Sequence, residues 1–246
     1  MPSLLQDFYM IPFKLLEGVI YISIAVIILN RNKKSTLHRT YFVSILSWGI
    51  YILLDMILYP LAHFETTYTG TLTIDSQVWE IPLVANILRD IALIFAGILA
   101  VGFLYASIIL KYGEDYAKKP KIILTFFILY FVVVIPTILF DVTIRSGDYV
   151  KSYFNIGSVL MMFAQIVILL IGLYYLAQLY SKFEEGIPKR SIGNFILGTA
   201  LLLGGIIFFI VVGLMNLTAY AAITGPIGHG MWTVGAIFIY KGNTRS

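Results

Sequence analysis

Six residues whose side chains can do chemistry stand within long apolar stretches of the sequence, where such groups are rare. They are Glu17, Asp55, Arg89, Asp90, His229 and Trp232. Carboxylate, guanidinium and imidazole groups can bind a polar ligand, pair with one another or exchange a proton, and an indole can form the apolar wall of a site. We therefore expect these residues to form a ligand-binding or proton-sensing site.

The spacing of the charged residues predicts how they pair. Lys14 and Glu17 are three positions apart and share a helix face, so we expect a local ion pair. Arg89 and Asp90 are adjacent, and adjacent side chains leave a helix about 100° apart. We expect one of them to pair with Asp55 or Glu17 across a helix interface and the other to face a cavity or a second helix. The alternative is a polar clamp that fixes helix register and binds nothing.

The segment 225–232 reads Gly-Pro-Ile-Gly-His-Gly-Met-Trp. Proline removes a backbone donor and glycine weakens a helix, so we expect a kink or a locally unwound stretch here. His229 and Trp232 are three residues apart and would share one face. The alternative is a packed kink with a hydrogen-bonded histidine.

The composition identifies the environment that must hold these residues. Of the 246 residues, 59% are hydrophobic and only 12% are charged, and the mean hydropathy is +0.90. A soluble domain carries about 25% charged residues, so we expect an integral membrane protein. The sequence has no cysteine, which excludes disulfides, thiolate metal sites and cysteine nucleophiles.

Seven apolar stretches reach the roughly 20 residues that a membrane-spanning helix needs. The sequence therefore predicts an all-α protein, a single bundle of seven transmembrane helices over residues 1–246, with the spans near 11–30, 41–62, 82–110, 122–140, 153–180, 192–215 and 218–240. Between the second and third spans, residues 63–80 are rich in threonine around a glycine. We expect an exposed loop there, with a short hairpin or extended lid as the alternative.

Most of the 17 lysine and arginine residues fall in alternate loops and the tail, which indicates the cytoplasmic side. They are Arg31, Lys33, Lys34 and Arg39, then Lys111, Lys118, Lys119 and Lys121, then Lys182, Lys189 and Arg190, and finally Lys241 and Arg245. The N-terminus is therefore expected outside and the C-terminus in the cytoplasm, in the plasma membrane. Because these charges are spread over three loops and a tail, we expect no nucleic-acid partner.

Residue counting then predicts the depth of each polar group. At 1.5 Å per residue, Glu17 lies roughly 7–9 Å and Asp55 and Arg89 each roughly 10 Å below the outer surface, with His229 nearer the middle of the membrane. The inner half is almost purely apolar. The other two histidines, His38 and His63, are expected at opposite faces, so we expect no metal site, haem or other cofactor.

One part of the sequence carries a family resemblance. The run Asn30-Arg31-Asn32-Lys33-Lys34, the run 37–42 and Ser-Trp-Gly-Ile-Tyr at 47–51 together resemble the first inner loop and second helix of the seven-helix sensor modules that precede histidine kinase and cyclase domains. Arg-Asp-Ile-Ala at 89–92 is similar to the same modules. The resemblance implies a seven-helix sensor whose output is cytoplasmic. Since the sequence ends at Ser246, we expect that output to pass through a partner.

The expected function is thus a receptor-like sensor or ligand-binding protein with a polar pocket in the outer half of the bundle. Its expected partners are the lipid bilayer, a small molecule or proton from outside, and a cytoplasmic or membrane signalling protein. We assign no catalytic residue. The alternatives are a small proton-coupled transporter, which needs a polar path through the inner half, and a non-catalytic scaffold subunit of a membrane complex, which needs a filled core.

Overall fold

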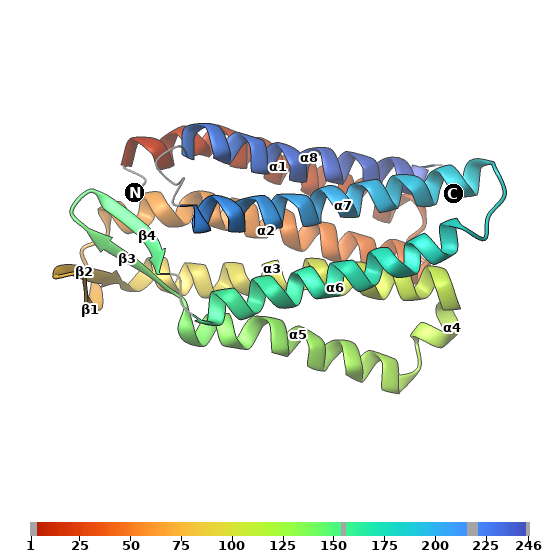
Figure 1. Ribbon diagram of the computed structural model, residues 1–246, viewed down its shortest axis with the longest axis horizontal. Helices are drawn as coiled ribbons and strands as arrows, with labels where there is room; N and C mark the ends of the chain where they lie inside the picture. The colour runs from red at the N-terminus through yellow and green to blue at the C-terminus, as the bar shows by residue number, and fades with distance from the viewer. Residues whose placement is uncertain (1–3, 154–155, 216–220, 245–246) are drawn as a thin grey trace.

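The computed structural model describes residues 4–153, 156–215 and 221–244. Its helices run alternately between the two ends of an elongated bundle (Figure 1). Seven long helices coincide with the seven predicted segments, although the expected start of the last segment, residue 218, lies outside the described residues. The helices are α1 (Leu4–Arg31), α2 (Thr36–Phe64), α3 (Leu83–Tyr112), the short α4 (Glu114–Ala117), α5 (Pro120–Phe140), α6 (Ile156–Tyr180), α7 (Ile187–Leu214) and α8 (Ala221–Thr244).

Six of these helices are long and apolar enough to cross a membrane, namely α1, α2, α3, α5, α6 and α7. The chain therefore has the architecture of a helical integral membrane protein. The helix α8 is less apolar, because glycine, proline and histidine occupy its first half, and it packs against α1 and α7.

The long helices form a ring around a common axis. Contacts follow the order α1, α2, α3, α6, α7, α8 and return to α1, while α5 packs outside the ring against α3 and α6. Figure 1 shows this outer position of α5 at the edge of the bundle opposite α1 and α8. Six helices thus enclose a central volume.

A four-stranded antiparallel sheet caps the end of the bundle where the chain begins (Figure 1). It joins two hairpins in the order β1 (Tyr68–Ile74), β2 (Gln77–Pro82), β3 (Val142–Ser146) and β4 (Tyr149–Tyr153). The first hairpin corrects our expectation of a plain loop over 63–80. Its two turn residues, Asp75 and Ser76, both have positive φ, the backbone that tight two-residue hairpins require.

The second hairpin was not predicted, and it shortens the span expected from 153, since α6 begins at Ile156. Gly147 has a φ of 58° at the turn. The alternation of Thr143 and Arg145 with Val142 and Ile144, followed by Gly-Asp, is a hairpin signal in the sequence. We had assigned this stretch to an outer loop because its polar residues interrupt two apolar spans.

Side-chain hydrogen bonds attach the sheet to the bundle. The Asn86 amide on α3 donates to the Thr143 carbonyl at 2.9 Å and accepts from the Thr143 N–H at 2.8 Å. The buried carboxylate of Glu65 accepts from the N–H groups of Val84 and Ala85 and so caps the first turn of α3, where an anion is favoured. The sheet is therefore held in one place over the end of the bundle.

The helix α8 corrects one expectation about residues 225–232. It is continuous through Pro226 and is not locally unwound. Pro226 is the sixth residue of the described helix, so its missing N–H removes a single hydrogen bond near the helix start. Gly228 lies against the Phe209 ring, where a β-carbon would come within 2.3 Å, so the glycine serves packing rather than flexibility.

The half of the bundle away from the sheet is tightly packed. The Tyr41 ring stacks on Phe195 at 5.0 Å and meets the edge of Phe103 at 5.6 Å. The backbones of α7 and α8 approach each other at Gly198, where an added β-carbon would lie 2.7 Å from the Gly235 carbonyl oxygen. Small residues permit such close helix contacts in membranes.

This contact gives a prediction about stability. Gly198→Ala should lower the free energy of unfolding by about 1–3 kcal/mol, because the new methyl group would overlap α8. Gly213→Ala on the same helix is the matched control, since nothing lies within 4 Å of its β-carbon position, and it should cause no loss. Unfolding in mixed detergent micelles measures both. Equal stability of the two variants would contradict the close approach of α7 and α8.

Candidate functional site

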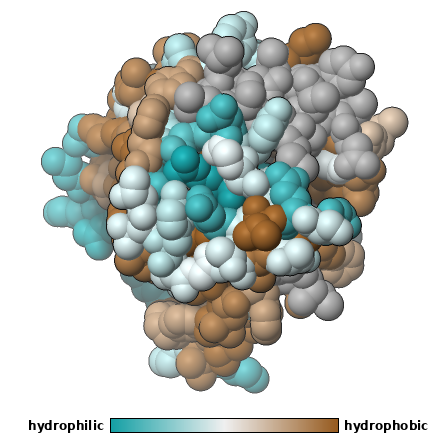
Figure 2. Space-filling model, turned by 90° about the vertical axis from the view of Figure 1, so that its left-hand side faces the viewer, coloured by the Kyte–Doolittle hydropathy of each residue, from teal (hydrophilic) through white to brown (hydrophobic). Residues whose placement is uncertain are grey.

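A cavity of about 360 Å³ lies within the helix ring, towards the end that carries the sheet. Side chains from α1, α2, α3, α5, α6, α7, α8 and β4 line it. Figure 2, which looks onto that end of the molecule, shows hydrophilic residues gathered in the middle and hydrophobic residues around much of the flanks. A cavity of this size falls at the lower end of the range for small-molecule sites.

The first polar contact on the cavity wall joins α1 to α2. The Lys14 ammonium lies 2.7 Å from a carboxylate oxygen of Asp55, and both side chains are largely buried. Lys14 also lies 5.2 Å from the centre of the Tyr59 ring. Asp55 thus takes the partner that we had expected Glu17 to take. Lys14 reaches α2 because α1 and α2 pack closely, with Gly18 and Gly49 facing each other.

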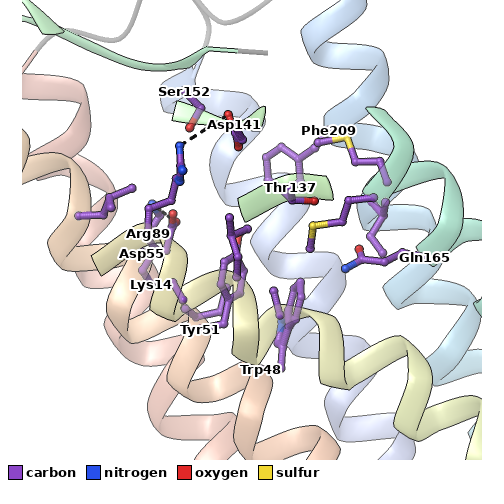
Figure 3. Close-up of a pocket in the computed structure, with 18 of the residues that line it drawn as sticks. Lys14, Trp48, Tyr51, Asp55, Arg89, Thr137, Asp141, Ser152, Gln165 and Phe209 are labelled. Atoms are coloured by element: carbon purple, nitrogen blue, oxygen red, sulfur yellow. Dashed lines mark hydrogen bonds and ion pairs between the residues drawn. The ribbon is translucent and has the colours of Figure 1, made fainter. Parts of the chain in front are cut away.

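The second polar contact centres on Arg89 of α3, whose side chain is only 8% exposed. Its guanidinium lies 2.7 Å from the Asp90 carboxylate and 4.0 Å from that of Asp141, which follows α5. Figure 3 shows Arg89 pointing towards Asp141 and Ser152 across the cavity. Among the described residues, Nε and Nη1 of Arg89 have no hydrogen-bond acceptor.

The contacts of Arg89 correct the predicted pairing across a helix interface with Asp55 or Glu17. Arg89 and Asp90 leave the helix in different directions, but the arginine side chain is long enough to turn its guanidinium back towards the neighbouring carboxylate. Asp90 is 39% exposed and lies outside the cavity lining.

A third polar contact is buried deeper and joins α1 to α8. Nδ1 of His229 and a carboxylate oxygen of Glu17 share a short hydrogen bond, and the two residues are 7% and 1% exposed. His229 lines the cavity and Glu17 lies behind it. We had placed Glu17 nearer the surface than His229, because α1 was expected to begin at residue 11 rather than at Leu4.

Aromatic side chains form the apolar wall of the cavity. The rings of Trp48 and Trp232 meet edge to face at 5.0 Å, and Phe209 lies 4.9 Å from Trp232. Gly205 leaves room for the indole of Trp232, since a β-carbon there would come within 2.3 Å of Nε1. Figure 3 shows Trp48 below the charged groups of the site.

Trp232 also connects four helices. Its Nε1–H donates to the Leu202 carbonyl of α7 at 3.2 Å, and its own carbonyl accepts from the Tyr21 hydroxyl of α1 at 2.7 Å. Together with the ring contact to Trp48 on α2, these bonds hold α8 to α1, α2 and α7. The cavity wall is therefore part of the packing that fixes α8.

The structure brings the six predicted site residues into one region. Asp55, Arg89, His229 and Trp232 line the cavity, while Glu17 and Asp90 each contact a lining residue. No three histidine, aspartate or glutamate side chains of the described chain converge as metal ligands would.

Sequence reasoning missed several lining residues. Gln165 is an amide within the apolar run of α6, so the rule that selected the charged residues would also select it. Trp48, Tyr51 and Asp55 recur at helical spacing on one face of α2, which could have identified the aromatic wall. Asp141 joins the site only through tertiary packing, and no sequence signal places it beside Arg89.

No protein-family model, curated protein or solved structure matches this chain. The resemblance to seven-helix sensor modules therefore stays a prediction, and the cavity is the feature of the molecule that bears on its function.

A double-mutant cycle tests the contact between α1 and α8. Glu17→Ala and His229→Ala should show a coupling free energy of about 0.6–1.7 kcal/mol, the range of side-chain hydrogen bonds in membrane proteins. The control is the pair Glu185 and Lys189, in which the Glu185 side chain is 85% exposed, and its coupling should be smaller because water competes for the carboxylate. For each pair, the free energies of unfolding of the wild type, the two single variants and the double variant give the coupling free energy. Equal coupling in the two cycles would remove the buried pair as a link between α1 and α8.

Proposed function

We propose that this protein is a receptor-like membrane sensor that binds a small molecule from the outside in the cavity of its helix ring. The observation that carries this proposal is a cavity lined both by charged groups and by aromatic rings. Ligand sites combine an apolar lining with a few converging polar groups in this way.

The proposed topology has seven spans, with the N-terminus outside and the C-terminus in the cytoplasm of a cell whose plasma membrane holds the protein. The six apolar helices supply six spans, and α8, which closes the ring between α7 and α1, is the proposed seventh. The loops near Lys33, Lys119 and Lys182 lie at the same end as the C-terminus (Figure 1). The positive-inside rule favours that end as cytoplasmic, which leaves the sheet and the cavity on the outer side.

A signal would travel through α8. A ligand in the cavity would touch His229 and Trp232, whose hydrogen bonds hold α8 to α1 and α7. At the opposite end of α8, the Gly242 and Asn243 carbonyls accept hydrogen bonds from Ser191 and Arg31. A ligand that favours a different position of α8 would shift the balance between two arrangements of the bundle, and a cytoplasmic or membrane partner would detect the change at the inner end.

The packing of the inner half favours a sensor over a proton-coupled transporter. Below Trp48 and Trp232, the buried cluster contains side chains such as Ile28, Leu99 and Leu202, which offer no relay for protons or path for a polar substrate. A scaffold subunit would have no use for an unfilled core. The cavity therefore supports binding, followed by a change in helix packing.

Cysteine labelling tests the proposal cleanly, because the chain has no native cysteine. Gln165→Cys, on the cavity wall, should react with a small charged methanethiosulfonate added to the outside of vesicles. Ser44→Cys, buried in the inner half, should react about tenfold more slowly or not at all. Lys119→Cys should react only from the cytoplasmic side and so reports orientation.

Other labelling patterns would contradict the proposal. Reaction of Gln165→Cys from both sides of the membrane would support the transporter instead. Protection of Gln165→Cys from both sides would mean that the cavity has no outer opening.

A further inference from the structure

The charged side chains on the cavity wall already have partners of opposite charge. The Lys14 ammonium lies 2.7 Å from the Asp55 carboxylate. The Arg89 guanidinium lies 2.7 Å from Asp90 and 4.0 Å from Asp141, and Asp141 has a further interaction besides that with Arg89. A charged ligand would add a net charge to this poorly solvated space or break one of these pairs, and both changes cost free energy. The ligand should therefore be uncharged.

Some other polar groups of the wall are also committed or out of reach. His229 and Glu17 share a hydrogen bond with each other. Nε and Nη1 of Arg89 and Oγ1 of Thr137 have no hydrogen-bond partner among the described residues, but all three atoms are buried within the protein. These groups offer little to a ligand that occupies the cavity as it stands.

The amide of Gln165, in contrast, is open to the cavity. Gln165 is 6% exposed and lines the cavity from α6, and Figure 3 shows its side chain extending towards the middle of that space. The amide makes no hydrogen bond to any residue that the structure describes. A buried amide without partners is unfavourable, so a ligand that bonds to it gains free energy.

The chemistry of an amide defines the polar group of the ligand. Gln165 presents an acceptor oxygen beside a donor nitrogen. A ligand carboxamide has the same two groups side by side and carries no net charge, so it can both donate to and accept from Gln165. A carboxylate would supply acceptors alone, and an ammonium donors alone.

The size and walls of the cavity define the rest of the ligand. At about 30 Å³ for each water-sized group, a volume of 360 Å³ accommodates roughly a dozen non-hydrogen atoms. Trp48 and Phe209 each contact the ring of Trp232, at 5.0 Å and 4.9 Å, and all three line the cavity. A single aromatic ring fits such a wall, since aromatic groups pack favourably edge to face or offset.

We propose, on the basis of the proposed binding function, that the ligand is a compact, uncharged aromatic carboxamide. Its amide group exchanges a pair of hydrogen bonds with the amide of Gln165. Its ring packs against Trp48, Phe209 and Trp232. The ion pairs of the wall stay intact when it binds.

Four probes with the same ring and chain separate charge from hydrogen bonding. They are 3-phenylpropionamide, the anion 3-phenylpropionate, the cation 3-phenylpropylamine, and 4-phenylbutan-2-one, a neutral ketone that can only accept. Isothermal titration calorimetry of the full chain in lipid nanodiscs should show that the carboxamide binds at least about tenfold more tightly than either ion. It should also bind at least about threefold more tightly than the ketone, which loses one hydrogen bond.

Variants of Gln165 assign the contact. Gln165→Leu should reduce the preference for the carboxamide over the ketone to less than about twofold, and retained binding of the ketone shows that the variant is folded. Gln165→Glu should reverse the selectivity in favour of 3-phenylpropylamine, because a carboxylate binds an ammonium more strongly than an amide. Gln178→Leu is the control on the same helix, since Gln178 bonds to Lys111 outside the cavity, and it should leave all four affinities unchanged.

The outcomes distinguish this inference from the proposed function. Tighter binding of either ion than of the carboxamide would overturn the uncharged ligand and leave a ligand-binding protein. An unchanged preference for the carboxamide in Gln165→Leu would overturn the contact with Gln165. Absence of binding by all four probes would overturn the ligand class. Cysteine labelling uses none of these probes and decides the binding function separately.

Discussion

A charged side chain in a hydrocarbon environment is stable only beside a partner, and this constraint organises the end of the bundle that carries the sheet. Lys14 meets Asp55 between α1 and α2, and Glu17 meets His229 between α1 and α8. Arg89 lies between Asp90 and the end of α5. The contacts of Lys14 with Asp55, of Glu17 with His229 and of Arg89 with Asp141 each join different elements of the bundle, so the charges hold the helices around a common space.

That space persists because closing it would cost free energy at the charged side chains that surround it. Collapse of the ring would bring Asp55 and Asp141 closer together, or would force the Arg89 guanidinium further from solvent. In the inner half, buried apolar side chains such as Ile45 and Leu99 pack against one another instead. One bundle thus contains a tightly packed half and a half with a cavity.

Most of the fold could be predicted because membrane helices leave strong signals. Apolar length located the seven long helices that the structure describes, and the scarcity of ionisable residues within them selected the cavity-lining residues Asp55, Arg89 and His229. Pairing could not be predicted, because Lys14 and Arg89 have long side chains that reach more than one acid, and helix position alone does not choose among them. The second hairpin of the sheet was not predicted because the segment 142–153 is short and partly polar, so a search for apolar spans treats it as a loop.

Glycine shows the same limit of sequence reasoning. Gly198 allows α7 to approach α8 closely, as small residues commonly do between membrane helices. Gly205, seven residues further on, instead makes room for the Trp232 indole, which forms both the cavity wall and the contact between α8 and its neighbours. Any ligand that presses on this indole must therefore act on helix packing as well, since the ring cannot move without altering its bond to Leu202 or its contact with Trp48. Ligand binding beside this ring would therefore be coupled to helix packing through a single side chain, a property that the proposed sensor requires and a passive binding site does not.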